Sequence, residues 1–325
     1  MKLKKIKRVA AAGAAMLMTL SLAGCGAGSR SVKLGAAGVG GGYYAFSNAF
    51  AQMAVAADED LEFEVKATAG STANIRLLSD GYIDMAIAQA DLVDAAYNGT
   101  GVTDKKRYRG YSAVASLYTE ACQIVVRADS GIDSLDDLQG KKVSVGEEES
   151  GTQRNAEQIL KMTGLVESLV DTVNLDYVDA ANELKSGQID AFFCTAGIQT
   201  SVIEELSKEC DVKLIGIDDK CRDRLKSVYG FYTDYTIPAG TYEGQDQDVE
   251  TLGVRAVLLA RDDMDEEIVE ELTGLLFEHS QDIQYSIPLT FQIDESEAVK
   301  NVTIPFHDGA KAYYQKKRIE LPAEQ

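Results

Sequence analysis

The sequence of 325 residues has no tryptophan, only two histidines and four prolines, and far fewer basic than acidic side chains. Lys and Arg number 32 against 52 Asp and Glu, which gives a formal charge of -20. This deficit of positive charge argues against DNA or RNA as the main partner, because neutralising phosphates needs clustered Lys and Arg. Two histidines leave little room for a His-built metal site or triad, and no P-loop, G-x-S-x-G, C-x-x-C or H-E-x-x-H motif occurs. Binding is therefore favoured over catalysis, with no metal or cofactor expected.

The N-terminus has the pattern of a signal peptide. Residues 2–8 carry five positive charges, and an uncharged apolar run of about 15 residues follows from Val9 to Ala23. The run is shorter than the roughly 20 residues of a membrane-spanning helix, and it ends in Leu22-Ala23-Gly24-Cys25, which resembles a bacterial lipobox. We predict that residues 1–24 are removed and that a lipidated Cys25, with residues 25–31 as tether, anchors the protein to the outer face of the cell membrane. A plain secretory signal with a chance cysteine is the alternative.

Besides the lipidated Cys25, the mature chain has four cysteines: Cys122, Cys194, Cys210 and Cys221. An oxidising compartment permits disulfides, and Cys210 and Cys221 are close enough in sequence to close a local loop. Buried free thiols are the alternative, and the sequence leaves both open. Without residues 1–24 the charge becomes 27 minus 52, or -25.

From Ser31 onward, short β-like runs alternate with helical stretches, a pattern typical of an α/β fold with mostly parallel sheets. Residues 43–57 predict a helix, residues 173–178 a strand, and residues 181–185 a short helix. Two longer β runs suit strands that cross between lobes: residues 112–118 continuing into 122–127, and residues 252–261.

The chain length fits two lobes. We predict that lobe 1 comprises residues 32–121 and 251–325, that lobe 2 comprises residues 122–250, and that the ligand cleft lies between them.

A pattern that occurs twice supports two similar lobes. In the first series Asn74 is followed by a helix and then by Gly81-Tyr82-Ile83-Asp84; in the second Asn182 is followed by a helix and then by Gly187-Gln188-Ile189-Asp190. Each Gly is expected to end its helix and each Ile to begin a buried strand.

Two loops are candidates for ligand binding, because ligands of parallel α/β sheets bind where strands end and helix N-termini present free N–H groups. The first is the glycine-rich run Gly38–Gly42, followed by Tyr43 and Tyr44; the second is Ser150-Gly151-Thr152, in which Ser150 or Thr152 caps a helix that Gly164 ends. A dinucleotide fingerprint fails on spacing, since the third Gly of G-x-G-x-x-G would fall at Tyr43. A tight turn with close packing is the alternative for the glycine run.

Two further features have both a functional and a plain structural interpretation. Glu147-Glu148-Glu149 could be part of a cation site, but a solvated acidic loop is the more common outcome. His307 could contact a ligand, but a residue that caps the last helix is the more common outcome.

The chain resembles the TAXI family, the solute-binding subunits of a class of tripartite ATP-independent periplasmic (TRAP) transporters. The likeness extends from about Val32 to Tyr314. It rests on these segments: residues 34–44 (LGAAGVGGGYY), 71–99 (STANIRLLSDGYIDMAIAQADLVDAAYNG), 115–118 (ASLY), 140–146 (GKKVSVG), 150–152 (SGT), 237–242 (IPAGTY) and 307–310 (HDGA). The resemblance implies the type II periplasmic binding protein fold, in which two α/β lobes close on a small ligand, and a small carboxylate-bearing solute such as glutamate or a related organic acid.

The resemblance also implies where the cleft residues lie, and the residues themselves suggest roles. Backbone N–H groups of the glycine loop with Ser150 and Thr152 would hold an anionic group, Asp91 could pair with an ammonium, and Arg154 could add positive charge. The candidate ligand-binding residues are Gly40, Gly41, Gly42, Tyr43, Tyr44, Ser71, Thr72, Asn74, Gln89, Asp91, Ser150, Gly151, Thr152, Arg154, Ala196 and Gly197.

The sequence departs from the family at several of these places. Members commonly have Thr where this chain has Ala36 and Gly40, so two candidate hydroxyl donors are absent. They commonly have Pro-Pro-Gly in place of Glu147-Glu148-Glu149, and a Pro near Gln199. Three carboxylates beside the cleft would disfavour an anionic ligand unless they project to solvent.

The sequence therefore predicts a monomeric, membrane-tethered receptor that captures a small solute and delivers it, lobes closed, to a TRAP-type membrane permease. A receptor that presents its solute to a sensor kinase is one alternative. An extracytoplasmic enzyme on the same fold is another, since fold does not settle function, and it would need an acid/base pair in the cleft.

Overall fold

A computed structural model describes residues 30–101, 105–165, 168–287 and 293–322. The predicted signal segment, Cys25 and most of the tether lie outside these ranges. No helix within them has both the length and the apolar content needed to cross a bilayer.

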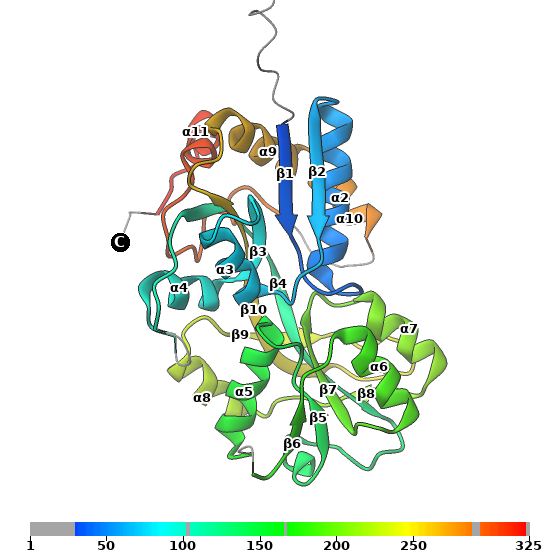
Figure 1. The fold of residues 1–325 in the computed structure, drawn as a ribbon. Coiled ribbons are helices and arrows are strands. Elements are labelled where there is room, and N and C mark those ends of the chain that lie inside the picture. Colours follow the sequence, from blue (N-terminus) through cyan, green and yellow to red (C-terminus); the bar gives the residue numbers. More distant parts are fainter. Residues whose placement is uncertain (1–29, 102–104, 166–167, 288–292, 323–325) are drawn as a thin grey trace, which may run out of the picture.

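The protein has two lobes joined by long strands, with helices packed against a curled sheet (Figure 1). The described strands form one sheet with the path β2-β1-β3-β10-β4-β7-β5-β6, while β8 pairs with β4 and β9 pairs with β10. Pairs β1–β2, β1–β3, β5–β6 and β5–β7 are parallel, and every pair that includes β4 or β10 is antiparallel.

The upper lobe of Figure 1 starts at the blue end of the chain and receives the C-terminal helices. Its elements are β1 (Arg30–Gly35), α2 (Gly42–Ala57), β2 (Leu61–Lys66), α3 (Ser71–Ser79), β3 (Met85–Gln89), α4 (Ala90–Asn98), α9 (Glu266–Glu278), α10 (Ser280–Ser286) and α11 (Asp308–Lys317).

Two strands run between the lobes, as the long β runs of the sequence predict. They are β4 (Tyr111–Arg127) and β10 (Val249–Arg261), which pair with each other along most of their length.

The lower lobe of Figure 1 is built from the middle of the chain. Its elements are a 3-10 helix (Leu135–Leu138), β5 (Lys142–Ser144), α5 (Gly151–Thr163), β6 (Asp171–Val173), α6 (Tyr177–Ser186), β7 (Ala191–Ala196), α7 (Ser201–Glu209), β8 (Val212–Leu214), α8 (Asp219–Val228) and β9 (Thr233–Ile237).

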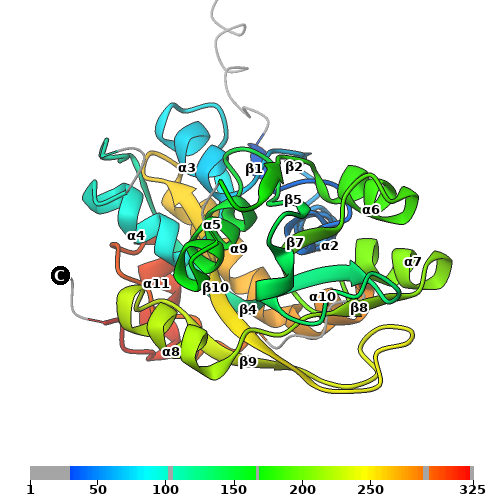
Figure 2. The same ribbon diagram turned by 90° about the horizontal axis from the view of Figure 1, so that it is seen from below.

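Each lobe has its own apolar core. One buried cluster joins α2, α3, α9 and α11 to β1, β3 and the upper halves of β4 and β10. In the other lobe, α5 and α8 cover one face of the sheet and α6 and α7 cover the other, as Figure 2 shows from below. The residue limits predicted for the lobes stay a prediction.

One segment of the second series differs from its prediction. The strand expected over residues 173–178 ends at Val173, and the helix expected over 181–185 is longer, running from Tyr177 to Ser186. The reason is Asp176, whose side chain accepts a hydrogen bond from the backbone N–H of Asp179 at 2.8 Å and so starts α6 early.

The four cysteines are free thiols, and His307 is the N-cap of α11. Cys122, Cys194, Cys210 and Cys221 are all free thiols, so the Cys210–Cys221 disulfide is not formed. His307 caps α11, since its Nδ1 accepts from the backbone N–H of Gly309 at 3.1 Å. The capping interpretation of His307 is thereby confirmed.

Candidate functional site

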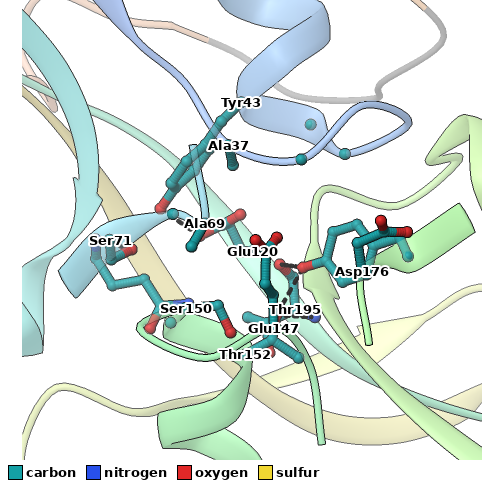
Figure 3. Close-up of a pocket in the computed structure, with 17 residues that line it drawn as sticks. Ala37, Tyr43, Ala69, Ser71, Glu120, Glu147, Ser150, Thr152, Asp176 and Thr195 are labelled. Carbon is teal, nitrogen blue, oxygen red and sulfur yellow. Dashed lines mark hydrogen bonds between the residues drawn. The ribbon is translucent and has the colours of Figure 1, made fainter. Parts of the chain in front are cut away.

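A small cavity of about 40 Å³ lies where the two lobes face each other. At about 10–15 Å³ for each water molecule, it has room for only a few waters. Figure 3 shows its wall, with Tyr43 and Ala37 on one side, Ser150 and Thr152 on the other, and Glu120 between them. The lining residues are Ala37, Gly38, Gly41, Gly42, Tyr43, Ala69, Gly70, Ser71, Gln89, Glu120, Glu147, Ser150, Gly151, Thr152, Asp176, Tyr177 and Thr195.

The N-terminus of α2 forms one part of the wall. Gly41 is the N-cap, no side chain caps the helix, and no acidic residue occupies its first turn. The first N–H groups of a helix have no partner within the helix, so α2 presents unsatisfied donors beside the cavity. A Cβ on Gly41 would lie 3.0 Å from the ring of Tyr177, which explains why glycine suits this close approach between lobes.

The N-terminus of α5 forms the opposite part. Ser150 caps the helix by accepting from the N–H of Gln153 at 2.9 Å, as predicted, and its own hydroxyl hydrogen remains available as a donor. Thr152 instead belongs to a network in which its hydroxyl lies 2.6 Å from that of Tyr177 and accepts from the N–H of Thr195 at 3.2 Å. Thr152 therefore holds the wall together.

A third part comes from α3 and β3. The hydroxyl of Ser71 accepts from the backbone N–H of Gln89 at 3.1 Å, and both residues line the cavity. Asn74 lies behind them, fully buried, and its amide nitrogen donates to the carbonyl oxygens of Ala36 and Ile87 at 2.5 and 2.9 Å. Asn74 thus links the end of β1, just before the glycine run, to β3 from outside the cavity.

Glu120 on β4 is the most buried acid of the cavity, with 2% of its surface exposed. The hydroxyl of Tyr43 donates to its Oε2 at 2.6 Å. Burial raises the pKa of Glu120 to about 8, although the hydrogen bonds from Tyr43 and Gln89 act in the opposite direction. The carboxyl therefore titrates near neutral pH.

The three glutamates at 147–149 have three different environments. Glu147 lines the cavity, where burial and the charge of Asp176 raise its pKa. Glu148 is exposed. Glu149 forms a two-bonded ion pair with Arg76 of α3, at 3.0 Å to Nε and 2.7 Å to Nη2. Within the described residues, no group of three or more His, Cys, Asp or Glu side chains is arranged to hold a metal ion.

Direct contacts between the lobes keep the cavity closed. The backbone carbonyl of Glu149 accepts from the N–H groups of Thr72 and Ala73 at 3.1 and 3.2 Å, so lobe 2 caps α3 of lobe 1. The hydroxyls of Thr200 and Ser201 both donate to the carbonyl of Gly40 at 3.1 Å.

Eight of the predicted ligand-binding residues line this cavity and eight do not. Gly40 and Tyr44 line a groove between α2, α6 and α7, while Thr72, Asp91 and Arg154 line a separate groove of about 590 Å³. The residues outside the cavity are Gly40, Tyr44, Thr72, Asn74, Asp91, Arg154, Ala196 and Gly197.

Asp91 and Arg154 therefore do not face this cavity. Burial raises the pKa of Asp91 to about 6, and Arg154 lies 3.7 Å from Glu157 on its own helix. The positive charge expected from Arg154 is absent from the cavity wall.

Several cavity residues carry no sequence signal of their own. Glu120 lies in β4, a strand of mostly buried residues. A single acid within such a strand is the one sign in the sequence that Glu120 has a functional role. Thr195 ends a buried strand, and Tyr177 starts a helix whose beginning the sequence places too late. Asp176 has the most recognisable signal, an acidic N-cap.

The sequence profile of the NMT1-like family matches residues 34–317, nearly all of the described chain. A solved structure from Bordetella bronchiseptica RB50 has a TM-score of 0.58 at 15% identity, covering 89% of this chain and 98% of that one. A periplasmic transporter has a TM-score of 0.57 at 13% identity, covering 83% and 90%. A putative L-cystine ABC transporter protein from Listeria monocytogenes has a TM-score of 0.50 at 14% identity, covering 79% and 94%. At these identities the likeness shows the two-lobed fold alone.

Proposed function

The chain belongs to the NMT1-like family, and on that premise we propose that it is an extracytoplasmic receptor that captures a small solute between its lobes and delivers it to a membrane permease. The observation that carries the proposal is the cavity itself. It is lined by residues of both lobes, many of them polar, and hydrogen bonds between the lobes, which a rigid-body opening would break, keep it as small as a few waters, so that a solute enters as the lobes part.

The proposed solute is small and carries a carboxylate, as an amino acid such as glutamate or a related organic acid does. Unsatisfied N–H groups at the start of α2 and the hydroxyl of Ser150 support this, because both donate hydrogen bonds toward negative charge. The proposed binding residues are the eight predicted ones that line the cavity, with Glu120, Tyr177 and Thr195 added: Gly41, Gly42, Tyr43, Ser71, Gln89, Ser150, Gly151, Thr152, Glu120, Tyr177 and Thr195.

The permease is proposed to be of the TRAP type, and the receptor to be anchored by a lipid on Cys25. The resemblance to the TAXI family over most of the chain supports the first, and the lipobox-like Leu22–Cys25 supports the second. Mass spectrometry of the protein from its native membrane tests the anchor, since a diacylated Cys25 at the N-terminus is the expected product.

A thermal-shift screen of residues 26–325 tests capture of a solute. A solute at 100 times its dissociation constant adds about 2.7 kcal/mol to the free energy of unfolding. We expect a shift with carboxylate-bearing solutes that Ser150→Ala reduces. Thr163→Ala at the far end of α5, where the hydroxyl bonds only to carbonyls of the same helix, is the matched control and leaves the shift unchanged. A folded protein that arrives without solute and responds to none contradicts the proposal.

An enzyme on the same fold is the second candidate, and Glu120 is the observation that favours it, because a carboxyl that titrates near neutral pH suits general acid or base catalysis. The two candidates differ in what happens to the solute. A receptor returns it chemically unchanged after hours of incubation, which NMR of the mixture measures directly.

A further inference from the structure

The cavity wall is rich in hydrogen-bond acceptors and carries no cationic side chain. None of its lining residues is Lys, Arg or His, whereas three of them are acids: Glu120, Glu147 and Asp176. Arg76 is not among the lining residues and is paired with Glu149, the residue before Ser150. A solute with only negative charge would meet these three carboxyls without a compensating cation.

Gln89 adds a fourth acceptor whose direction is fixed by a chain of hydrogen bonds. Tyr232 donates to Gln158 at 2.5 Å, the amide nitrogen of Asn155 donates to Tyr232 at 2.8 Å, and Nε2 of Gln89 donates to Oδ1 of Asn155 at 3.0 Å. Each donor in this chain is committed, so Gln89 cannot exchange its oxygen and nitrogen without losing the bond to Asn155.

The consequence is a buried acceptor without a donor. Oε1 of Gln89 has no hydrogen-bond partner among the residues that the structure describes, although the residue is 98% buried and lines the cavity. Leaving a buried polar atom unsatisfied is costly, so such an atom in a ligand cavity indicates a donor that the ligand brings.

Glu120 also lacks a partner, which in its case is a positive charge. It is 98% buried, and its hydrogen bonds come from the hydroxyl of Tyr43, at 2.6 Å, and from the amide of Gln89, which are both neutral groups. The groups that act on its ionisation include no Lys or Arg. A buried carboxyl is normally paired with a cation or with several donors.

We propose that the acceptors Glu120 and Gln89, with Glu147 and Asp176 facing them, bind a cationic N–H group of the solute, so that the solute is an amine-bearing compound such as a zwitterionic amino acid. This rests on the proposed function and narrows it. The ammonium group lies against the acidic wall, and a carboxylate of the same solute lies at the N–H groups of α2 and Ser150. Organic acids without an amino group are excluded.

Isothermal titration calorimetry on residues 26–325 tests this with matched pairs of solutes. Each amino acid of a panel is compared with the 2-oxo acid of the same carbon skeleton, and diamines form a third group. We expect at least one amino acid or diamine to bind and the matched oxo acid to bind at least about 100-fold more weakly, because an unpaired buried carboxyl and an unsatisfied amide oxygen would remain.

Two variants with one matched control locate the effect. Asp176→Asn removes one negative charge from the wall, and Glu120→Gln removes the carboxyl that ionises against the bound cation, so in each variant we expect affinity for the aminated solute to fall about 10-fold or more. Glu148→Gln removes the same charge from the exposed neighbour of Glu147 and leaves affinity within about 2-fold.

Proton release by the unmodified protein gives a readout that does not depend on how the variants fold. With the pKa of Glu120 at about 8, a cation that ionises the carboxyl at pH 7 releases up to about 0.9 protons, measured as the change of binding enthalpy between buffers. A carboxylate bound by the protonated carboxyl releases none and takes up at most about 0.1 proton there. The other titratable groups around Glu120 are Tyr43, Asp91, Tyr118, Cys122, Tyr177 and Cys194, with Glu147 and Asp176 on the same cavity wall.

The outcomes separate this inference from the proposed function. Tight binding of an amine-free acid, without proton release, overturns the inference and keeps the receptor. Binding of neither class by a folded protein without a copurified solute counts against both. Binding of the aminated solute with proton release, lost in Glu120→Gln and kept in Glu148→Gln, supports the inference.

Discussion

The turn before β3 in one lobe and the turn before β7 in the other have the same geometry. Gly81 and Gly187 are left-handed, with φ of 75° and 74°. The carboxylates of Asp84 and Asp190 each accept from a backbone N–H of the neighbouring strand at 2.9 Å, that of Lys33 in the first lobe and that of Lys142 in the second. The two turns therefore fix the strand order of each lobe in one common way.

The helices that lead into these turns differ. Asn74 of α3 is fully buried and donates to backbone carbonyls at the end of β1 and in β3, whereas Asn182 of α6 is exposed. The N-terminus of α3 is capped by the carbonyl of Glu149 from the other lobe, while α6 is capped by its own Asp176. The turns, which are alike in the two lobes, thus maintain the scaffold. The helices α3 and α6, which differ, build the cavity and the contact between lobes.

The largest expected effect lies on β4, which links the two repeats. Burial raises the pKa of Glu120 from 4.5 to about 8, and each pKa unit corresponds to about 1.4 kcal/mol, so at most about 5 kcal/mol is involved. The folded chain keeps this proton between pH 4.5 and 8 while the unfolded chain releases it, so stability falls as pH rises through that range. Melting temperatures of the solute-free protein at pH 5, 6.5 and 8 measure the fall.

Glu120→Gln should flatten this pH dependence. Asp91 and Glu147 have pKa values raised in the same direction, so a shallower slope remains in the variant. A variant whose slope equals that of the parent would show that Glu120 is ionised in the solute-free protein.

Asn74→Ala and Asn182→Ala test the difference between the repeats. Asn74→Ala leaves buried carbonyls without a donor, and we expect a loss of about 3 kcal/mol in the free energy of unfolding. Asn182→Ala at the equivalent exposed position should change it by less than about 0.5 kcal/mol. Urea denaturation followed by circular dichroism measures both, and equal losses would mean that Asn74 has no special role.

Asp84→Ala and Asp190→Ala test the similarity. Each removes an acceptor from one strand N–H, and Asp84 also lies 3.6 Å from Arg261, so we expect losses of about 1–1.5 kcal/mol that agree within about 1 kcal/mol. The measurement is the same urea titration. A loss of stability in only one of the two variants would show that the turn stabilises one lobe and not the other, although its geometry is the same in both.

The smallest effect is expected at the contact between lobes. Glu149 has a φ of 65°, which is rare for a residue with a side chain, and its carboxylate pairs with Arg76. Glu149→Gly relieves the backbone and removes the pair, and Glu149→Gln weakens the pair alone. Because such pairs contribute about 1 kcal/mol or less, we expect both variants to open the protein slightly, seen as a larger radius of gyration by X-ray scattering.

Lys185→Ala is the control for this experiment, since its ion pair with Glu209 at 2.8 Å lies within one lobe. It should leave the radius of gyration unchanged. A parent and a Glu149→Gln variant with identical scattering would mean that the ion pair does not help to hold the lobes together.

Much of the scaffold is predictable because it depends on local patterns. The helix at 43–57, the crossing strands and the Ser150 cap all follow from periodicity, strand composition and N-cap chemistry, and the structure confirms them. The Gly-x-Ile-Asp repeat was predictable for the same reason, since glycine at a helix end and isoleucine at a strand start are local preferences.

The cavity wall was only half predictable, because burial and direction are not local. Glu120 reaches the cavity from a strand interior, and whether Asp91 or Arg154 faces the solute depends on how the lobes meet. The acidic run at 147–149 shows the limit best, since three identical neighbours end in the cavity, in solvent and in an ion pair with the other lobe.

The size of the closed cavity has a kinetic consequence. A space of about 40 Å³, lined by both lobes and bordered by hydrogen bonds between them, is too small for a solute of amino-acid size to pass through, so dissociation must wait until the lobes separate. The opening rate then sets a common ceiling on the off-rates of all solutes, whatever their affinities. Weak and strong solutes would differ chiefly in how often the opened protein recloses before release, and a permease that spreads the lobes would accelerate unloading without touching the solute.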